Sequence, residues 1–312
     1  MNSILHKTNT QHTPSVMSKK KRVRFIINPH SGAHKSINVE TLIDQELDKT
    51  HFEYDIAYTE YAGHATELAA EAVSEGCDIV VAVGGDGSVN EVAKSLINTE
   101  TVLGILPAGS GNGFAMHLGW GRDMASVLRR FSSAKIEIID TCLMNNRPFI
   151  NLAGVGFEAK VVYKTRNAPK RGFQAYAKGF FNQLFSYKFK EYTVKIDNKI
   201  IVTEALTITV ANAPMYGYNF IIAPLAKLDS GKLEVVVIKR AQKFRYLMTA
   251  IQMFTGNINK SPVVKHFTGE KIEIMLNESD FAQVDGEGYP IETEKLVFTV
   301  KHLSLKVLVP SC

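Results

Sequence analysis

The chain has 312 residues, of which 45% are hydrophobic and 21% charged, so it is long enough to bury a sizeable core and to form two domains. Its three cysteines, Cys77, Cys142 and Cys312, are odd in number and far apart, which excludes a disulfide framework and favours a reducing cytoplasm. The net charge of +5 is spread along the chain and suits nucleotides, anionic lipid surfaces or nucleic acid alike.

Residues 1–20 are polar and lack the apolar stretch of a signal peptide, which predicts a disordered leader. Residues 21–135 then alternate between two patterns. Strands are predicted at Val23–Ile27, Glu53–Tyr58, Ile79–Val83 and Val102–Leu106, and helices at Ser36–Lys49, His64–Glu75, Val89–Ile97, Gly113–Leu118 and Met124–Phe131. Repeated strand–helix units predict an open parallel sheet flanked by helices, as in an α/β nucleotide-binding domain.

Residues 136–312 have a different pattern, in which strand-like segments dominate and turn signals separate them. The predicted strands are Ile136–Asp140, Pro148–Ala153, Tyr192–Ile196, Ala205–Ala211, Leu233–Ile238, Lys271–Met275 and Leu296–Val300. Two helical stretches interrupt them, Phe173–Phe185 and Phe244–Phe254. This half is predicted to be an antiparallel β-sandwich that carries the substrate side, and a return of its last strands to the first domain is left open.

A glycine-rich segment, Gly84-Gly85-Asp86-Gly87-Ser88-Val89-Asn90-Glu91, directly follows a buried strand and opens a helix. Ligands bind at the carboxyl ends of such strands, where glycines let the backbone approach closely and N–H groups at a helix start bind anions. A bare carboxylate beside a phosphate would repel it unless a cation lay between them. Asp86 therefore indicates Mg²⁺ or a proton-accepting role, and the alternative is that it merely caps the helix.

Three more predicted strands end in small polar residues. Asn28-Pro29-His30-Ser31-Gly32 follows the first strand, Thr59 the second, and Pro107-Ala108-Gly109-Ser110-Gly111-Asn112 the fourth. The carboxyl ends of parallel strands share one edge, so these loops are expected to form one phosphate site. A Walker A loop and a GxGxxG after the first strand are both missing, which argues against those two nucleotide sites.

Five segments, in this order, resemble the diacylglycerol kinase catalytic-domain family, which includes bacterial lipid kinases, sphingosine kinases and ceramide kinases. They are Asn28–Gly32, Gly84–Glu91, Leu106–Asn112, Gly154–Phe157 and Asp285-Gly286-Glu287. The resemblance runs from residue 22 to the C-terminus. It implies an N-terminal α/β domain of the NAD-kinase and diacylglycerol-kinase type, a C-terminal β-sandwich, and an ATP site in the cleft between them.

The resemblance also implies site residues. ATP would contact Asn28, Pro29, Ser31, Gly32, Thr59, Gly84, Gly85, Asp86, Gly87, Ser88, Asn90, Glu91, Ser110, Gly111 and Asn112. Glu287 matches the family's proposed proton acceptor, while Asp86 would act near the phosphates and Mg²⁺. In sphingosine-kinase-like relatives the residue equivalent to Asp86 is itself discussed as the base, so the choice between the two carboxylates stays open. Taken alone, Asp285-Gly286-Glu287 also fits a plain hairpin turn.

Several positions depart from the family pattern. Ser88 and Ser110 stand where threonine is usual and keep the hydroxyl, and Glu158 replaces an aspartate. Gly113 stands where aspartate is common, which puts one nucleotide contact in doubt. Ser230 takes the place of the carboxylate in a structural Mg²⁺ site of bacterial members, which puts that second metal in doubt.

The expected function is that of an ATP-dependent lipid kinase, with diacylglycerol as the default substrate, phosphatidic acid as its product, and Mg²⁺ as cofactor. The partners expected are ATP and a lipid at the cytoplasmic membrane face, without nucleic acid; a homodimer is left open. An NAD-kinase-like enzyme with a soluble substrate shares Gly84–Gly87 and is the nearest alternative. A nucleotide-binding regulator with an inactive site is the non-enzymatic one.

Membrane contact is expected to be peripheral, because no apolar run approaches the roughly 20 residues of a spanning helix. Aromatic residues at helical spacing, flanked by lysines and Arg171, mark one candidate contact: Tyr176, Phe180, Phe181 and Phe185. Such a helix would either dock on an anionic membrane or pack on the sandwich with its lysines reaching solvent.

Overall fold

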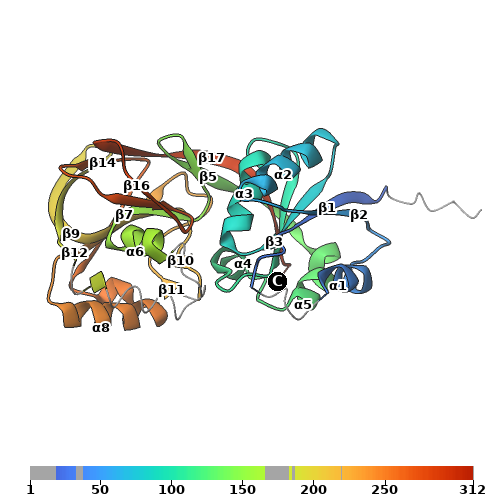
Figure 1. Cartoon of the computed structure of the whole chain (residues 1–312), viewed down its shortest axis with the longest axis horizontal. Coiled ribbons are helices and arrows are strands. Elements are labelled where there is room, and N and C mark those ends of the chain that lie inside the picture. The colour runs from blue at the N-terminus through green and yellow to red at the C-terminus, as the bar shows by residue number, and fades with distance from the viewer. Residues whose placement is uncertain (1–18, 33–37, 166–182, 185–186, 219, 312) are drawn as a thin grey trace, which may run out of the picture.

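A computed structural model of the protein describes residues 19–32, 38–165, 183–184, 187–218 and 220–311 (Figure 1). It confirms the predicted fold class, an N-terminal α/β domain with parallel strands and a C-terminal antiparallel β-sandwich. The predicted leader lies outside the described residues except for Lys19 and Lys20. The helix predicted over Phe173–Phe185 also lies outside them, apart from Gln183 and Leu184.

The N-terminal sheet is built from four parallel strands in the order β4-β3-β1-β2. Their bounds are β1 (Lys21–Ile27), β2 (Phe52–Tyr58), β3 (Ile79–Gly84) and β4 (Val102–Pro107). Every residue of β3 and β4 is buried, as expected for parallel strands with helices on both faces. In Figure 1, α2 (His64–Ser74) and α3 (Asp86–Leu96) cover one face, and α1 (Val39–Glu46) and α5 (Met124–Arg130) the other.

Two helix ends show how local sequence sets these boundaries. Helix α1 begins after Asn38, whose side chain accepts a hydrogen bond from Thr41 N at 3.1 Å. Helix α2 ends before Gly76, the residue that follows the predicted helix His64–Glu75. Gly76 has φ of +74° and its N–H donates to Val73 O, while Cys77 N donates to Ala72 O. This pair of bonds forms a Schellman motif, which favours glycine because of the left-handed backbone.

The C-terminal domain consists of antiparallel strands packed around a second apolar core. The strands are β5 (Lys135–Met144), β6 (Arg147–Phe149), β7 (Leu152–Gly156), β8 (Lys190–Ile196), β9 (Lys199–Ala211), β10 (Met215–Tyr216), β11 (Phe220–Ile221), β12 (Leu233–Lys239), β13 (Val264–Gly269), β14 (Lys271–Leu276), β15 (Phe281–Val284), β16 (Glu287–Pro290) and β17 (Lys295–Val309). Helix α8 (Lys243–Phe254) forms where helix was predicted, whereas α6 (Phe157–Thr165) was not foreseen.

The prediction of one strand over Pro148–Ala153 was wrong. Strands β6 and β7 are separate, because the backbone N–H groups of Ile150 and Asn151 turn away from a ladder and donate to the carboxylate of Asp285 at 2.9 and 3.0 Å. The acceptor lies 135 residues further along the chain, so no local pattern marks this break.

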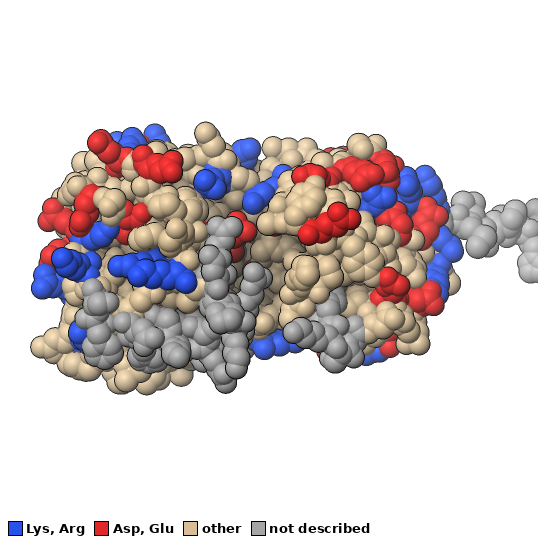
Figure 2. Space-filling model, viewed as in Figure 1, with Lys and Arg blue, Asp and Glu red and all other residues tan. Residues whose placement is uncertain are grey.

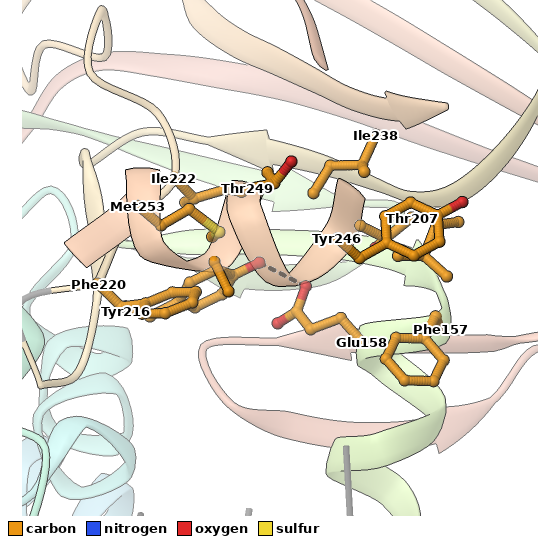
Figure 3. A pocket seen from close by; sticks show the side chains of 12 residues that line it. Phe157, Glu158, Thr207, Tyr216, Phe220, Ile222, Ile238, Tyr246, Thr249 and Met253 are labelled. Carbon is orange, nitrogen blue, oxygen red and sulfur yellow. Dashed lines mark hydrogen bonds between the residues drawn. The ribbon is translucent and has the colours of Figure 1, made fainter. Parts of the chain in front are cut away.

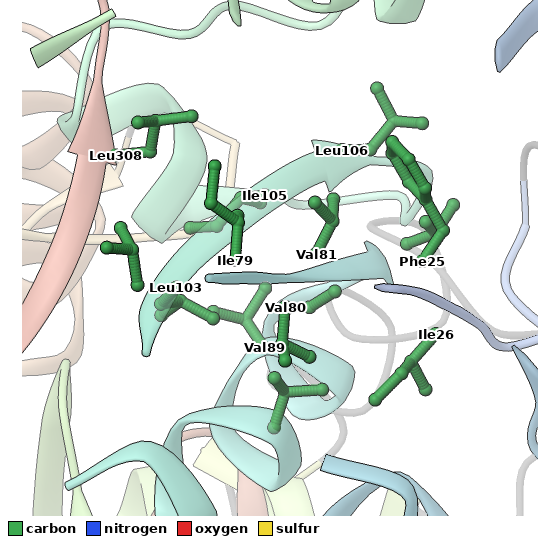
Figure 4. Close-up of a cluster of buried hydrophobic side chains, with 14 of the residues drawn as sticks. Phe25, Ile26, Ile79, Val80, Val81, Val89, Leu103, Ile105, Leu106 and Leu308 are labelled. Carbon is green, nitrogen blue, oxygen red and sulfur yellow. The ribbon is translucent and has the colours of Figure 1, made fainter. Parts of the chain in front are cut away.

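Strand β17 belongs to both domains. It pairs with β14 at its start, runs beside β5, and reaches β4, where Val307 pairs with Leu103. Its last residues are buried in the α/β core, and Figure 4 shows Leu308 in the same cluster as Ile79 and Ile105. Trp120 donates from Nε1 to the carbonyl of Leu308 at 2.9 Å. Across the described residues, the helices are too short or too polar to traverse a bilayer.

Candidate active site

The two glycine-rich loops after β3 and β4 are in direct contact. The carbonyl of Gly84 accepts hydrogen bonds from Ala108 N at 2.9 Å and from Gly109 N at 3.1 Å. A Cβ atom on Gly109 would lie 3.0 Å from Gly85 N and nearer still to its Cα, so this contact requires a glycine at position 109.

The loop after β1 joins the same edge of the sheet. Asn28 Nδ2 donates to Ser88 Oγ at 3.2 Å, and a Cβ atom on Gly32 would meet Ser110 Oγ at 3.2 Å. Ser31 donates from its backbone N and its Oγ to the carbonyl of Asn28, which folds the segment back on itself. Thr59, at the end of β2, is tied to the end of β1 by Thr59 N donating to Ile27 O at 2.9 Å. The structure thus brings the four loops together.

Asn112 holds the loop after β4 in shape. Its φ is +51°, a left-handed conformation that asparagine tolerates better than most residues. Its side chain accepts from Gly109 N at 2.9 Å and donates to Gly109 O at 2.7 Å. These two hydrogen bonds close a ring that contains Ser110 and Gly111, and Ser110 is exposed.

Asp86 is the first residue of α3, but its carboxylate does not cap that helix. It accepts from Gly113 N and Phe114 N, both at 3.0 Å, and so caps α4 (Gly113–His117). Each oxygen accepts one N–H and keeps further lone-pair capacity, so Asp86 fits a role as ligand to a cation. Among the described residues no three acidic, histidine or cysteine side chains gather at one point. Mg²⁺ at kinase sites is held by one or two carboxylates plus phosphates, so a single carboxylate is compatible with it.

The start of α4 is pressed against the C-terminal domain. A Cβ atom on Gly113 would lie 2.8 Å from Gly217 N and from the carbonyl of Tyr216, between β10 and β11. Tyr218 N also donates to Gly111 O at 3.4 Å. This contact explains the departure at position 113, because the aspartate common in the family has no room here.

Asp285 connects the β-sandwich to α3. Its carboxylate accepts from the backbone N–H groups of Ile150, Asn151 and Leu152 and from Nδ2 of Asn90. Burial raises the pKa of Asp285 to about 6, although these hydrogen bonds lower it. Asn90 lies one turn after Asp86 on α3, so the bond fixes the Asp285–Glu287 turn beside the helix that carries Asp86. Asn90 and Asp285 both belong to motifs found in the sequence, but the sequence did not indicate that they are in contact.

The Asp285–Glu287 segment is also the hairpin turn that sequence alone allowed. Asp285 and Gly286 have φ of +45° and +85°, and Val284 pairs with Glu287 across the turn. Two positive φ values in a two-residue loop are typical of a type I′ hairpin, for which Asp-Gly is a preferred sequence. Glu287 itself is exposed at the start of β16, within about 7 Å, Cα to Cα, of Asp285 because only one residue lies between them. Glu91 lies further along α3, where its carbonyl accepts from Thr66 Oγ1 of α2.

The residues around Ser230 do not fit a metal ion. Ser230 Oγ lies 3.2 Å from the carbonyls of both Lys227 and Lys232, the kind of oxygens that a structural Mg²⁺ would bridge. Gly231 N donates to the buried carboxylate of Asp140 at 2.6 Å. A hydroxyl and protein hydrogen bonds therefore hold this loop, and we assign no metal to it.

Glu158, which replaces the family's aspartate, is buried in the C-terminal domain. It lines an apolar cavity of about 50 Å³ and accepts a hydrogen bond from Tyr216 Oη (Figure 3). Burial raises the pKa of Glu158 to about 7, and hydrogen bonds from Tyr216 and Thr209 lower it only in part. The sequence showed only that a glutamate replaces an aspartate at this position, and it did not indicate that the side chain is buried.

The fold and the site together define a class of protein. Four loops gather at the carboxyl edge of a parallel sheet, α3 starts there with its N–H groups available to anions, and an Asp-Gly-Glu turn of a second domain joins the same helix. Figure 2 shows the surface hollowed between the two domains. This arrangement is that of a phosphate-binding, two-domain enzyme.

Comparison with known proteins identifies the family. Residues 22–144 match the diacylglycerol kinase catalytic domain, and residues 151–309 match the YegS C-terminal NAD kinase beta sandwich-like domain. A diacylglycerol kinase of Staphylococcus saprophyticus is 31% identical over 278 residues, covering 86% of this chain and 89% of the relative. That of Bacillus subtilis is 28% identical over 273 residues, covering 86% and 90%. A crystal structure of a Bacillus anthracis diacylglycerol kinase has the same fold, with a TM-score of 0.69 at 20% identity over 93% of this chain and 97% of that one.

The chain therefore belongs to the diacylglycerol kinase family, and it is a lipid kinase. Membership in a kinase family implies the use of ATP.

Proposed function

We propose that the protein transfers the γ-phosphate of ATP to the hydroxyl of diacylglycerol and forms phosphatidic acid, in peripheral contact with the cytoplasmic face of a membrane. The observation that carries the proposal is the bond from Asn90 to Asp285, because it joins the Asp-Gly-Glu turn of the sandwich to the helix that starts at Asp86. A nucleotide held by the loops and a lipid held by the sandwich would then meet at this junction.

The loop residues are proposed to bind the phosphates of ATP. The N–H groups of Gly85 to Ser88 lie at the start of α3, where the helix dipole favours anions. Asn28 to Gly32, Thr59 and Ser110 would complete the binding site from the neighbouring loops. Asp86 would hold Mg²⁺, and the ion would neutralise charge on the transferred phosphoryl group.

Glu287 is proposed as the general base. The carboxylate of Asp86 is fixed by two backbone N–H groups of α4 and is assigned here to Mg²⁺, whereas Glu287 is exposed at the domain junction. The carboxylate would take the proton of the lipid hydroxyl while that oxygen attacks the γ-phosphorus. The bond from phosphorus to the β,γ-bridging oxygen breaks, and ADP leaves with that oxygen.

The test is a turnover assay with labelled ATP and Mg²⁺ on three acceptors: diacylglycerol, a panel of other lipid alcohols, and NAD. We expect labelled phosphatidic acid from the first. Glu287→Gln is expected to lower kcat by about 10²-fold or more, the usual size of general-base assistance. The matched control is Glu292→Gln, another exposed glutamate five positions later, which should retain wild-type turnover.

Three results would count against the proposal. Product from NAD and none from lipids would favour the NAD-kinase-like alternative, and no product with bound ATP would favour a regulator. Full activity of Glu287→Gln together with an inactive Asp86→Asn would transfer the role of base to Asp86.

A further inference from the structure

Helix α8 is apolar on two opposite sides. Its inner side, which includes Tyr246, Thr249 and Met253, is buried against the sandwich and lines the cavity that contains Glu158 (Figure 3). At 100° per residue these three side chains point in one direction, which is the usual packing face of an amphipathic helix. This inner side accounts for the stability of α8.

The outer side exposes five large apolar side chains to solvent. The exposed fractions are 61% for Phe244, 52% for Leu247, 53% for Met248, 49% for Ile251 and 46% for Phe254. At 100° per residue they fall within an arc of about 120°, opposite the buried side. Isolated exposed apolar residues are ordinary, but a contiguous stripe on one helix marks a contact surface. Figure 1 shows α8 at the outer edge of the C-terminal domain.

The segment of the chain that carries this stripe is rich in cations, although Arg240 pairs with Glu204 at 3.1 Å. Residues 239–265 contain six lysines and arginines and no aspartate or glutamate. On the helix itself, Lys243 and Arg245 fall on the two borders of the stripe at 100° per residue. An apolar stripe bordered by cations matches the interface of an anionic bilayer, where apolar side chains enter the acyl boundary and cations meet the headgroups.

Helix α8 is also connected to the nucleotide loops. The rings of Phe254 and Phe220 meet edge to face with centroids 4.6 Å apart, and Phe220 belongs to β11, which pairs with β10. The turn between these two strands packs Gly217 against Gly111 and Gly113 of the loop after β4. A short, continuous series of contacts thus leads from the stripe to the candidate phosphate site.

We propose that the outer stripe of α8 docks the protein on an anionic lipid bilayer, from which the lipid substrate is then taken. This inference rests on the proposed function, because an enzyme with a soluble substrate would have no need to bind a bilayer. A second copy of the chain is a poorer occupant, because the cations that border the stripe on one copy would repel those on the other.

The experiment is flotation of the full chain with vesicles of phosphatidylcholine with or without 30% phosphatidylglycerol, in the absence of ATP. Leu247→Ser/Ile251→Ser removes two apolar groups from the stripe, and Ile200→Ser/Val202→Ser is the matched control on exposed residues of β9. We expect binding to the anionic vesicles to weaken about tenfold or more in the first variant, because each large apolar group contributes to insertion. The control should bind as the wild type does.

Charge and activity supply two further measurements. Arg245→Glu should weaken vesicle binding and reduce its dependence on salt concentration. The stripe variant should lose activity on long-chain diacylglycerol in vesicles and keep it on a short-chain, monomeric diacylglycerol. Retained activity on the short-chain lipid also demonstrates that the variant is folded.

Several outcomes would overturn the inference. One is a stripe variant that binds vesicles as tightly as the wild type. Another is a wild-type protein that phosphorylates short-chain diacylglycerol but does not float with vesicles of either composition. In that case the docking proposal fails while the proposed function stands. A third is a wild-type dimer that the stripe variant converts to a monomer, since the stripe would then join two copies. If only the proposed kinase function were wrong, the protein would still bind vesicles through the stripe but would phosphorylate no lipid.

Discussion

Asn112 closes a small ring in the loop after β4, and its two bonds to Gly109 set the path of the backbone at Ser110 and Gly111. Glycine at this position would keep the left-handed φ and lose both side-chain bonds. A substitution to glycine therefore tests the proposed contribution of the Asn112 side chain to nucleotide binding without changing the backbone conformation.

We expect Asn112→Gly to raise the KM for ATP about tenfold, because loss of two ordinary hydrogen bonds loosens the loop by about 1–3 kcal/mol. Steady-state kinetics at varied ATP concentration measure this change. Asn98, with φ of +60°, is the matched left-handed asparagine away from the loops, and Asn98→Gly should leave the KM unchanged. Equal effects of the two substitutions would contradict the assignment.

Glu158 should make the stability of the protein depend on pH. Burial raises its pKa from 4.5 to about 7, so between these values the folded state keeps a proton that the unfolded chain releases. The stabilisation from this proton is complete below the lower value and is lost as the pH rises through the upper one.

The difference in unfolding free energy between wild type and Glu158→Gln should fall by about 3 kcal/mol from pH 4.5 to pH 8, since one pKa unit corresponds to about 1.4 kcal/mol. Urea unfolding of both proteins at several pH values measures it. The glutamine variant is the internal control, because every other titrating group is common to both proteins. A constant difference across this range would show that burial does not keep Glu158 protonated.

At the scale of elements, the packing of α4 on the β10–β11 turn limits the size of the side chain at position 113. Gly113 lies where the backbone of Tyr216 and Gly217 leaves no space for a side chain. Asp86 of the first domain caps the same helix. The short helix is thus held between the two domains.

We expect Gly113→Ala to lower the unfolding free energy by about 1–3 kcal/mol, the usual cost of overpacking. Gly87→Ala is the matched control, because a Cβ atom there meets nothing within 4 Å. Alanine in a helix is favoured over glycine by up to about 1 kcal/mol, so this control should be as stable as the wild type or more so. Chemical denaturation of the three proteins measures both effects, and a stable Gly113→Ala would contradict the packing described.

At the scale of the molecule, β17 makes the last part of the chain a component of the first domain. Leu305, Val307 and Leu308 are buried in the α/β core, and the single tryptophan, Trp120, donates to the carbonyl of Leu308. The same strand begins in the sandwich beside β14. Loss of either domain should therefore disturb the other.

Leu308→Ala should cost about 2–5 kcal/mol of unfolding free energy, the range for removing a large buried aliphatic side chain. Leu303→Ala, on the same strand but 47% exposed, should cost much less. Trp120 fluorescence in urea measures both variants. Similar losses from the two substitutions would show that the end of β17 is not an integral part of the core.

Unfolding followed by Trp120 fluorescence should coincide with unfolding followed by far-ultraviolet circular dichroism. The first signal reports on the α/β domain, and the second on strands and helices of both domains. Coincidence is expected because β17 is shared and Asn90 bonds to Asp285 across the junction. A tryptophan transition that precedes the loss of sheet would show that the domains unfold independently.

Sequence by itself determined the features that depend on near neighbours along the chain. Alternating strand and helix patterns predicted the parallel sheet, because burial of a sheet between helices requires apolar strands. The rule that ligands meet the carboxyl ends of parallel strands predicted that the four loops would gather. The ordered motifs identified the family from the same local information.

Tertiary structure alone decided the contacts between distant residues. Asp285 breaks a strand 135 residues earlier, Asp86 caps a different helix from its own, and β17 crosses into the first domain. No local pattern encodes these features, because each partner satisfies a buried polar or apolar group that only the folded chain brings near. The outer stripe of α8 belongs with them: both sides of that helix are apolar, so only packing showed which side faces solvent.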